Sequence, residues 1–319
     1  RSRPFAKKND ILLCDKGISF PVQTGLGLSR ATPQFFEHND MNDLEKLMKA
    51  VVKKQTAKKI LTRRWVICEG VYPNFGDIAP LDKIQALANK YKFRVICDDS
   101  FGVGTLGKTG RGTAEMRGLK TSDVDVIVAA MGNAFGTVGG FCCSEEFAIM
   151  DTQRLEGLGY TYSASSPPFH AAAALKAAHL IDEQPERLSH LQQNITAMHT
   201  EIKKIANAEP RISYKADLSS PIAHIRLAPK FAKLAQRTCD TDVKVRVWEE
   251  QVLQNIVLAA FQYNRVALTR AKYAPQELFM PDPSIRITVN ALQNVKDVKG
   301  GISSLRSTIK SVLDSVEKH

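Results

Sequence analysis

The sequence has little of what disulfide-stabilised, metal-binding and membrane-spanning proteins need. Its 319 residues include six cysteines, and none of them forms a C-x-x-C pair or a zinc-ligand spacing. We therefore expect reduced, mostly buried thiols, no metal site and a cytosol-facing protein. We expect no signal peptide and no membrane anchor in this chain, because the uncharged stretch Val126–Cys143 is interrupted by glycines and Asn133. The cysteines are Cys14, Cys68, Cys97, Cys142, Cys143 and Cys239.

A concentrated basic segment is also missing, although the formal net charge is +11. The densest basic runs are the pairs Lys53-Lys54, Lys58-Lys59 and Arg63-Arg64, on or just after an expected helix. A solvated helix face is the favoured interpretation, and a contact with acidic lipid or with CoA phosphates stays open. We expect no nucleic-acid partner.

The first half of the chain has the pattern of an α/β protein. Short apolar runs at Ile11–Asp15, Trp65–Glu69 and Arg94–Asp98 predict buried strands, and a helix is expected from Pro80. A strand, a helix and a strand within about 35 residues form a βαβ unit, which implies a parallel sheet. Functional groups gather at the carboxyl ends of such strands, so we expect Glu69, Asp98 and a Gly132–Asn133 turn at one edge.

The second half of the chain changes pattern. Apolar residues spaced three or four apart predict helices over 188–205, 243–261 and 298–316, and strands are expected at 222–227, 265–269 and 284–290. We therefore predict a large α/β domain over residues 1–175 and a smaller α+β domain over residues 176–319.

The stretch VIVAAMGNAFGTVGG (Val126–Gly140) predicts a buried strand, a tight turn and a glycine-rich return. An acidic strand end followed about 35 residues later by such a turn is typical of pyridoxal-phosphate (PLP) enzymes. The acid holds the pyridine nitrogen, and a lysine in the turn forms the Schiff base. Here the turn position is Asn133, whose amide cannot form an imine.

Several motifs have two interpretations. Gly102–Thr109 matches the phosphate-binding P-loop G-x-x-x-x-G-K-T, but the following Gly-Arg-Gly discourages the helix that a P-loop requires. A glycine-rich surface loop is favoured there.

Ser163 and Ser165, ahead of a helix, could bind phosphate or simply cap the helix. Arg286, inside a strand, could bind a carboxylate or face solvent. Asp98 and Asp99 are adjacent in a strand and point to opposite faces, so they cannot share one role.

Residues 69–112 resemble the α-oxoamine synthases, which are fold-type I PLP enzymes that condense an amino acid with an acyl-CoA. The resemblance lies in GD-x-APL, a strand ending in an acid, and G-x-x-G-x-x-GRG, and FFEHNDM, GTVGGFCCS and YSASSPP also fit. Within this family, QRLEGLGYTYSAS, ALTRAKY and PDPSIR are similar to the non-catalytic long-chain-base subunits of serine palmitoyltransferases.

The resemblance implies a fold-type I chain whose large domain is N-terminally incomplete, because a glycine-rich motif and a membrane helix precede this start in the family. It places Asn133 at the lysine position, and Phe101 and Ser19 at two histidine positions. It keeps Asp98 as the acid facing the pyridine nitrogen, assigns Ser163 and Ser165 to the partner's PLP phosphate, and assigns Arg286 to a substrate carboxylate.

The resemblance further implies a lysine-bearing catalytic partner that holds PLP covalently, with L-serine and palmitoyl-CoA at a shared site. It implies the endoplasmic reticulum membrane, cytosolic face, as the location. The alternatives are a P-loop nucleotide-binding protein and a pure scaffold subunit that contributes nothing to the active site.

Overall fold

The computed structural model describes residues 9–58, 62–157, 159, 162–235 and 241–318. The chain forms two compact units. The first unit comprises Arg1–Tyr72, Ile78–Leu188 and Gln276–Phe279, and the second comprises Pro73–Asp77, Ser189–Pro275 and Met280–His319. Lys59 and Cys239, which the sequence analysis singled out, lie outside the described residues.

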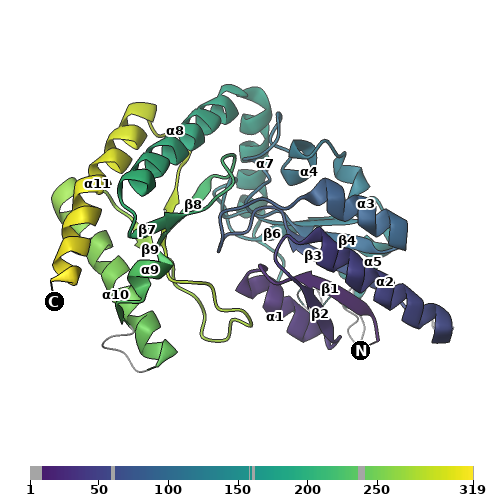
Figure 1. Cartoon of the computed structure of the whole chain (residues 1–319). Helices are drawn as coiled ribbons and strands as arrows, with labels where there is room; N and C mark the ends of the chain where they lie inside the picture. The colour runs from purple at the N-terminus through teal and green to yellow at the C-terminus, as the bar shows by residue number, and fades with distance from the viewer. Residues whose placement is uncertain (1–8, 59–61, 158, 160–161, 236–240, 319) are drawn as a thin grey trace. The chain divides into compact units, whose positions relative to one another are not determined.

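The first unit is built on a six-stranded sheet with the order β2-β1-β3-β4-β5-β6 (Figure 1). The strands pair in parallel except for β6, which runs antiparallel to β5. Leu13, Cys14 and Val66 are fully buried, because helices cover both faces of the sheet. The strands are β1 (Ile11–Asp15), β2 (Pro33–Phe36), β3 (Arg64–Glu69), β4 (Arg94–Asp98), β5 (Val126–Ala130) and β6 (Gly140–Cys143).

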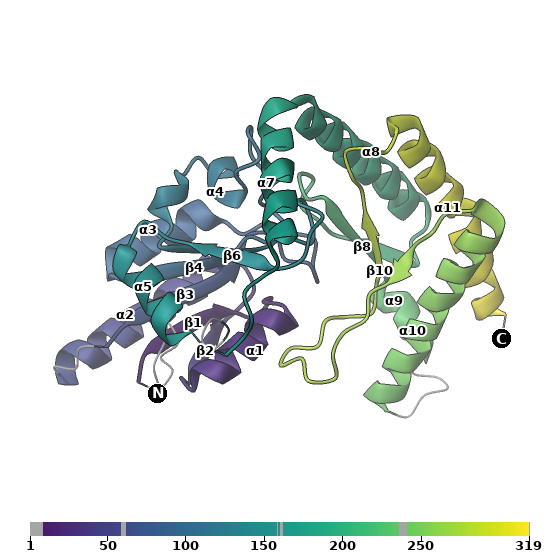
Figure 2. The same ribbon diagram turned by 180° about the vertical axis from the view of Figure 1, so that it is seen from behind.

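The helices of the first unit divide between the two faces of this sheet. From β1 the chain crosses to β2 at one edge and then returns past β1 to β3. Right-handed crossovers therefore place α1 and α2 on opposite faces. Both views show α2 and α3 on one face and α1 and α5 on the other (Figures 1 and 2). The helices are α1 (Phe20–Ser29), α2 (Met41–Lys58), α3 (Leu81–Tyr91), α4 (Thr113–Met116), α5 (Phe147–Glu156) and α7 (Pro168–Glu183), with a 3₁₀ turn at Thr121–Asp123.

The second unit packs helices on an antiparallel sheet with the order β7-β8-β10-β9. Its core is apolar side chains from α8, α10, α11 and the strands, and Ile202, Leu253 and Leu313 are fully buried. The strands are β7 (Ile212–Tyr214), β8 (Ile222–Leu227), β9 (Thr269–Arg270) and β10 (Ile285–Thr288). The helices are α8 (Glu186–Ala208), α9 (Pro229–Ala232), α10 (Asp242–Ala259) and α11 (Val295–Glu317), with a π-turn at Ala260–Asn264.

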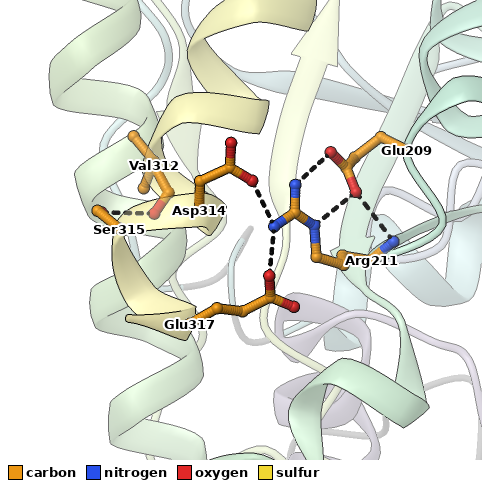
Figure 3. A network of polar contacts seen from close by, with 6 residues as sticks. All are labelled: Glu209, Arg211, Val312, Asp314, Ser315 and Glu317. Carbon is orange, nitrogen blue, oxygen red and sulfur yellow. Dashed lines mark hydrogen bonds and ion pairs between the residues drawn. The ribbon is translucent and has the colours of Figure 1, made fainter. Parts of the chain in front are cut away.

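One arginine joins the end of α8 to the closing helix α11 (Figure 3). The Arg211 Nε and one terminal nitrogen each donate to Glu209 at 2.7 Å. The other terminal nitrogen lies 2.8 Å from Asp314 Oδ1 and 3.0 Å from Glu317 Oε2. Such a bidentate, charge-assisted arrangement fixes the C-terminal helix against β7.

The predicted α/β class is confirmed. The strands predicted at Ile11–Asp15, Trp65–Glu69 and Arg94–Asp98 are confirmed as β1, β3 and β4. The predicted strand at 265–269 is wrong, because Arg265 has a left-handed φ of 55° and β9 begins only at Thr269. Helix α1 and strand β2 were not predicted. The described cysteines are free thiols, as expected. Among the helices in the described ranges, none combines the length and apolar character that a membrane crossing requires.

Candidate functional site

Three neighbouring strands of the first unit end in carboxylates at one edge of the sheet. Asp15 ends β1, Glu69 ends β3 and Asp98 ends β4, and Glu69 is paired in register with Asp98. Because these strands are parallel, their carboxyl ends lie side by side. The turn after β5, which carries Asn133, reaches the same edge through the contacts described next.

Ser100 connects Asp98 to the turn that holds Asn133. The Ser100 backbone N–H and hydroxyl donate to Asp98 Oδ1 at 3.0 and 2.5 Å. The Asn133 side-chain amide donates to the Ser100 carbonyl at 2.8 Å, and the Ala130 N–H donates to Ser100 Oγ at 2.8 Å. The structure therefore brings Asp98 and Asn133 together. The sequence analysis missed Ser100, and its position directly after two strand-end acids was the available signal.

Asp99 points to the opposite face from Asp98 and has a structural role. It is buried, and its carboxylate accepts from the Thr113 N–H at 2.8 Å and from the Thr113 hydroxyl at 2.7 Å. A Cβ on Gly102 would lie 1.9 Å from Asp99 Oδ1, so this glycine is needed for the close approach. Burial raises the pKa of Asp99 to about 6, and the bonds from Thr113 oppose that shift.

Ser19 and Glu69 form a buried pair beside Asp98. The Ser19 hydroxyl, at the N-terminus of α1, donates to Glu69 Oε1 instead of capping its helix. The other Glu69 oxygen, Oε2, has no hydrogen-bond partner among the described residues. The pKa of Glu69 is raised to about 8, chiefly by burial, with smaller contributions from the carboxylates of Asp98 and Asp15, while the bonds from Ser19 oppose the shift.

His38 is held by the carboxylate that ends β1. Its Nδ1 lies 2.6 Å from Asp15 Oδ1, and its ring meets the Tyr72 ring edge-on at 4.5 Å. Asp15 also accepts the N–H groups of Gly17 and Asn39, at 2.6 and 2.9 Å. No role was predicted for His38 from the sequence. The missed signal is that β1 and β2 are paired, which places His38 beside Asp15.

The remaining predicted site residues are Phe101, Ser163, Ser165 and Arg286. Phe101 is part-buried at the start of the loop 101–112, and its carbonyl accepts the Thr105 hydroxyl. Ser163 and Ser165 are exposed, and the Ser163 hydroxyl donates to the Gly159 carbonyl. Arg286 belongs to the second unit, where it is exposed on β10 and lines a hollow with Asn74 and Tyr273.

The P-loop interpretation of Gly102–Thr109 does not fit the geometry. No helix starts at Lys108, and the four-residue helix α4 begins only at Thr113. The Thr109 N–H and hydroxyl both bond to the Glu115 carboxylate, which occupies groups that a phosphate would need. Gly104, Gly107 and Gly110 have positive φ angles, as expected for a tight surface loop.

Covalent PLP does not fit this chain's own site. The turn position is an asparagine whose amide is already bonded to Ser100, and an amide forms no imine. Ser100 also occupies Asp98 Oδ1 with two bonds, while Asp98 Oδ2 has no partner among the described residues. The arrangement retains one acid and lacks the nucleophile.

The chain matches one protein-family model and has curated relatives of similar sequence. Residues 5–305 match the sequence model described as aminotransferase class I and II. The chain is 38% identical over 311 residues to serine palmitoyltransferase 1 of Dictyostelium discoideum, covering 98% of this chain and 62% of that protein. It is 30% identical to serine palmitoyltransferase 1 of Saccharomyces cerevisiae, covering 96% and 58%. The chain thus spans about three-fifths of the length of these curated relatives.

Solved structures support the fold. A serine palmitoyltransferase from S. paucimobilis, solved with a PLP–myriocin adduct, superposes with a TM-score of 0.76 at 22% identity, covering 97% of this chain and 68% of that one. The 8-amino-7-oxononanoate synthase of Francisella tularensis gives a TM-score of 0.71 at 22% identity, covering 96% and 77%. The architecture of this chain is therefore that of the PLP-dependent transferases of fold type I.

Proposed function

The chain belongs to the aminotransferase class I and II family, and we propose on this basis that it is a non-catalytic subunit of a serine palmitoyltransferase. The complete enzyme would condense L-serine with palmitoyl-CoA to 3-ketosphinganine, releasing CO2 and CoA, as the first step of sphingolipid synthesis. The names of its relatives in Dictyostelium and yeast support this assignment. The endoplasmic reticulum membrane, at its cytosolic face, is the proposed location.

The observation that carries the proposal is the state of the Asn133 turn. The strand-end acid and the turn are present and in contact through Ser100, but the turn carries an asparagine, whose amide cannot form the covalent bond to PLP. A chain that keeps the frame of the site without its nucleophile fits a subunit that supports a catalytic partner. We assign the covalent bond to PLP to a lysine of that partner.

The exposed apolar surface of the first unit supports a partner subunit. Large apolar side chains that are more than half exposed gather between residues 138 and 175, and they are Val138, Phe147, Leu155, Tyr162, Phe169 and Leu175. Helix α7 has an apolar, alanine-rich sequence, yet none of its residues is buried. An apolar helix left uncovered is unfavourable for a monomer and is typical of a subunit interface.

Within the pair, this chain's residues would bind and orient. Ser163 and Ser165 stand exposed just before α7. The Ser165 hydroxyl would donate to the phosphate of PLP in the partner's site, and the Ser163 hydroxyl would exchange its bond to the Gly159 carbonyl for one to that phosphate. Arg286 offers an exposed guanidinium for a substrate carboxylate. When bound by the partner, PLP would supply the electron sink that the decarboxylative condensation requires.

Co-expression with a lysine-bearing catalytic subunit tests the proposal. We expect the two chains to co-purify, and we expect serine-dependent CoA release only from the pair. Turnover by this chain alone, or a pair that assembles and never turns over, would contradict the assignment.

The pure-scaffold alternative is tested in the same complex. If Ser163 and Ser165 reach the cofactor phosphate, then Ser163→Ala with Ser165→Ala weakens PLP binding by the pair by about a hundredfold, since two hydrogen bonds to a charged group are lost and each is worth about 1.5 kcal/mol or more. Ser219→Ala with Ser303→Ala, both in the second unit, is the control. Unchanged PLP affinity and rate in the first variant would favour the scaffold.

A further inference from the structure

A hollow lies at the opposite edge of the first unit's sheet from the candidate site. It is lined by the first residues of β3 and β4 and by the N-terminal half of α5. The distance along β3 from Arg64 to Glu69 is five residues, or roughly 17 Å at the usual rise per strand residue. The hollow is therefore separate from the carboxylates at the carboxyl ends of the strands.

The charged side chains around the hollow are predominantly basic. Arg63, Arg64, Lys92 and Arg94 line it, and Glu146 is the single carboxylate among its lining residues. Lys92 is exposed and follows α3 in a left-handed conformation. Its backbone N–H donates to the Ala88 carbonyl, and its side chain has no hydrogen bond or ion pair among the described residues. Because four basic residues and one carboxylate line the hollow, its lining carries a net positive charge, which attracts anions.

The positive charge of Arg64 is held in place without being neutralised. Its Nε donates to the Gln55 side-chain oxygen, and a terminal nitrogen donates to the Tyr91 carbonyl at 3.0 Å. Both acceptors are uncharged. The guanidinium also lies over the Phe93 ring, 5.8 Å from its centroid. A cation fixed by neutral acceptors and an aromatic ring is pre-organised to meet an anion.

Arg94 is positioned in a similar way. Its guanidinium lies over the ring of the buried Trp65, 5.9 Å from the centroid. Asp125 is its only acidic neighbour within the described ion pairs, at 4.0 Å from Nε, and Asp125 also accepts the Val95 N–H at 2.9 Å. This pair is long and partly exposed, so it compensates little of the Arg94 charge.

We propose that this hollow is a binding site for a phosphate group. Phosphate suits it because the site offers several separate cations and planar guanidinium donors, which match a multiply charged oxyanion. The N-terminus of α5 faces the same hollow through Ala148 and Ile149, and its dipole favours an anion there, partly offset by the carboxylate of its N-cap residue, Glu146. The phosphate could belong to a soluble molecule or to a lipid headgroup.

The site is tested by two binding measurements on the purified chain and on its complex with the catalytic partner. Titration calorimetry with pyrophosphate measures the soluble form of the ligand. Co-sedimentation with phosphatidylcholine vesicles, with and without phosphatidic acid, measures the lipid form. The variant is Lys92→Gln with Arg94→Gln, because both side chains are exposed and their loss spares the core. The matched control is Lys230→Gln with Lys233→Gln, which removes the same charge from the surface near α9.

We expect the Lys92/Arg94 variant to bind at least about tenfold more weakly than wild type, since two charge-assisted contacts are lost. The control should bind like wild type, and both variants should keep the wild-type melting temperature. Pyrophosphate binding alone would identify a soluble ligand, and binding only to phosphatidic acid vesicles would identify a headgroup. Binding to neither probe, or an equal loss in the control, would overturn the proposal.

Discussion

At the scale of single residues, the adjacent acids Asp98 and Asp99 have different partners because strand geometry sends them to opposite faces. Asp98 faces the site and bonds to Ser100, whereas Asp99 organises the loop that follows through Thr113. The sequence analysis stated that the two cannot share a role, and the structure shows which role Asp99 has. The bonds between Asp99 and Thr113 could not be predicted from the sequence, because they depend on how the loop 101–112 folds back.

Replacement of Asp99 should loosen that loop more than replacement of its neighbour. Asp99→Ala removes both bonds to Thr113, and we expect the free energy of unfolding to fall by about 2 kcal/mol. Asp98→Ala, the matched control, loses only local contacts to Ser100 and should cost less than half as much. Urea unfolding measures both values, and trypsin cleavage after Lys108 and Arg111 reports on the loop directly. Equal stability loss in the two variants would contradict the structural role of Asp99.

Glu69 should make stability depend on pH. Burial raises its pKa from 4.5 to about 8, so the folded state holds a proton that the unfolded state releases between those values. Its stabilising contribution is complete below pH 4.5 and is lost as the pH rises through 8. From pH 6.5 to 8 we expect the free energy of unfolding to fall by about 2 kcal/mol more in wild type than in Glu69→Gln. Parallel pH profiles of the two proteins would show that Glu69 is ionised in the folded state.

At the scale of elements, much of the architecture follows from sequence periodicity. The buried strands β1, β3 and β4 and the helices α8 and α11 were predicted because their apolar residues recur at strand or helix spacing. Helix α1 was missed because Pro21, Gly25 and Gly27 weaken its helical signal, and tertiary contacts stabilise it instead. Strand β2 is short and has only one fully buried residue, Phe36, so its pattern is weak.

The ion pairs of Arg211 with Glu209, Asp314 and Glu317 should hold α11 against the rest of the second unit. Arg211→Ala leaves the buried Glu209 carboxylate without its bidentate partner, and we expect a loss of about 2 kcal/mol in the free energy of unfolding. Arg306→Ala, an exposed arginine on α11, is the control and should change stability by less than about 0.5 kcal/mol. Guanidinium unfolding followed by circular dichroism gives both values. Indistinguishable midpoints would mean that the network contributes nothing net.

Helix α7 should mediate pairing without contributing to the fold. Phe169 and Leu175 are 66% and 59% exposed, so Phe169→Ser with Leu175→Ser removes little buried surface from the single chain. In the pair these side chains are expected to be covered, and we expect co-purification with the catalytic subunit to drop by at least about tenfold. Leu218→Ser with Leu292→Ser, in the second unit, is the control for lost apolar surface. Full pairing by the α7 variant would exclude this helix from the interface.

At the scale of the whole molecule, the sequence resemblance and the comparisons agree on the family, while the site itself required the coordinates. The frame of a PLP site was predictable from the strand-end acid and the turn. The bonds that tie Ala130 and Asn133 to Ser100 were not, because they join residues about 30 positions apart. The chain spans about three-fifths of the length of its curated relatives.

We propose that this chain contributes to a PLP enzyme without carrying the cofactor covalently. Borohydride reduction of the co-purified pair fixes PLP on the lysine that holds it, and mass spectrometry of each subunit then locates the pyridoxyl group. We predict that the label lies on one lysine of the catalytic partner and that no lysine of this chain is labelled. A pyridoxyl group on a lysine of this chain, at a level comparable to the partner's, would contradict the claim.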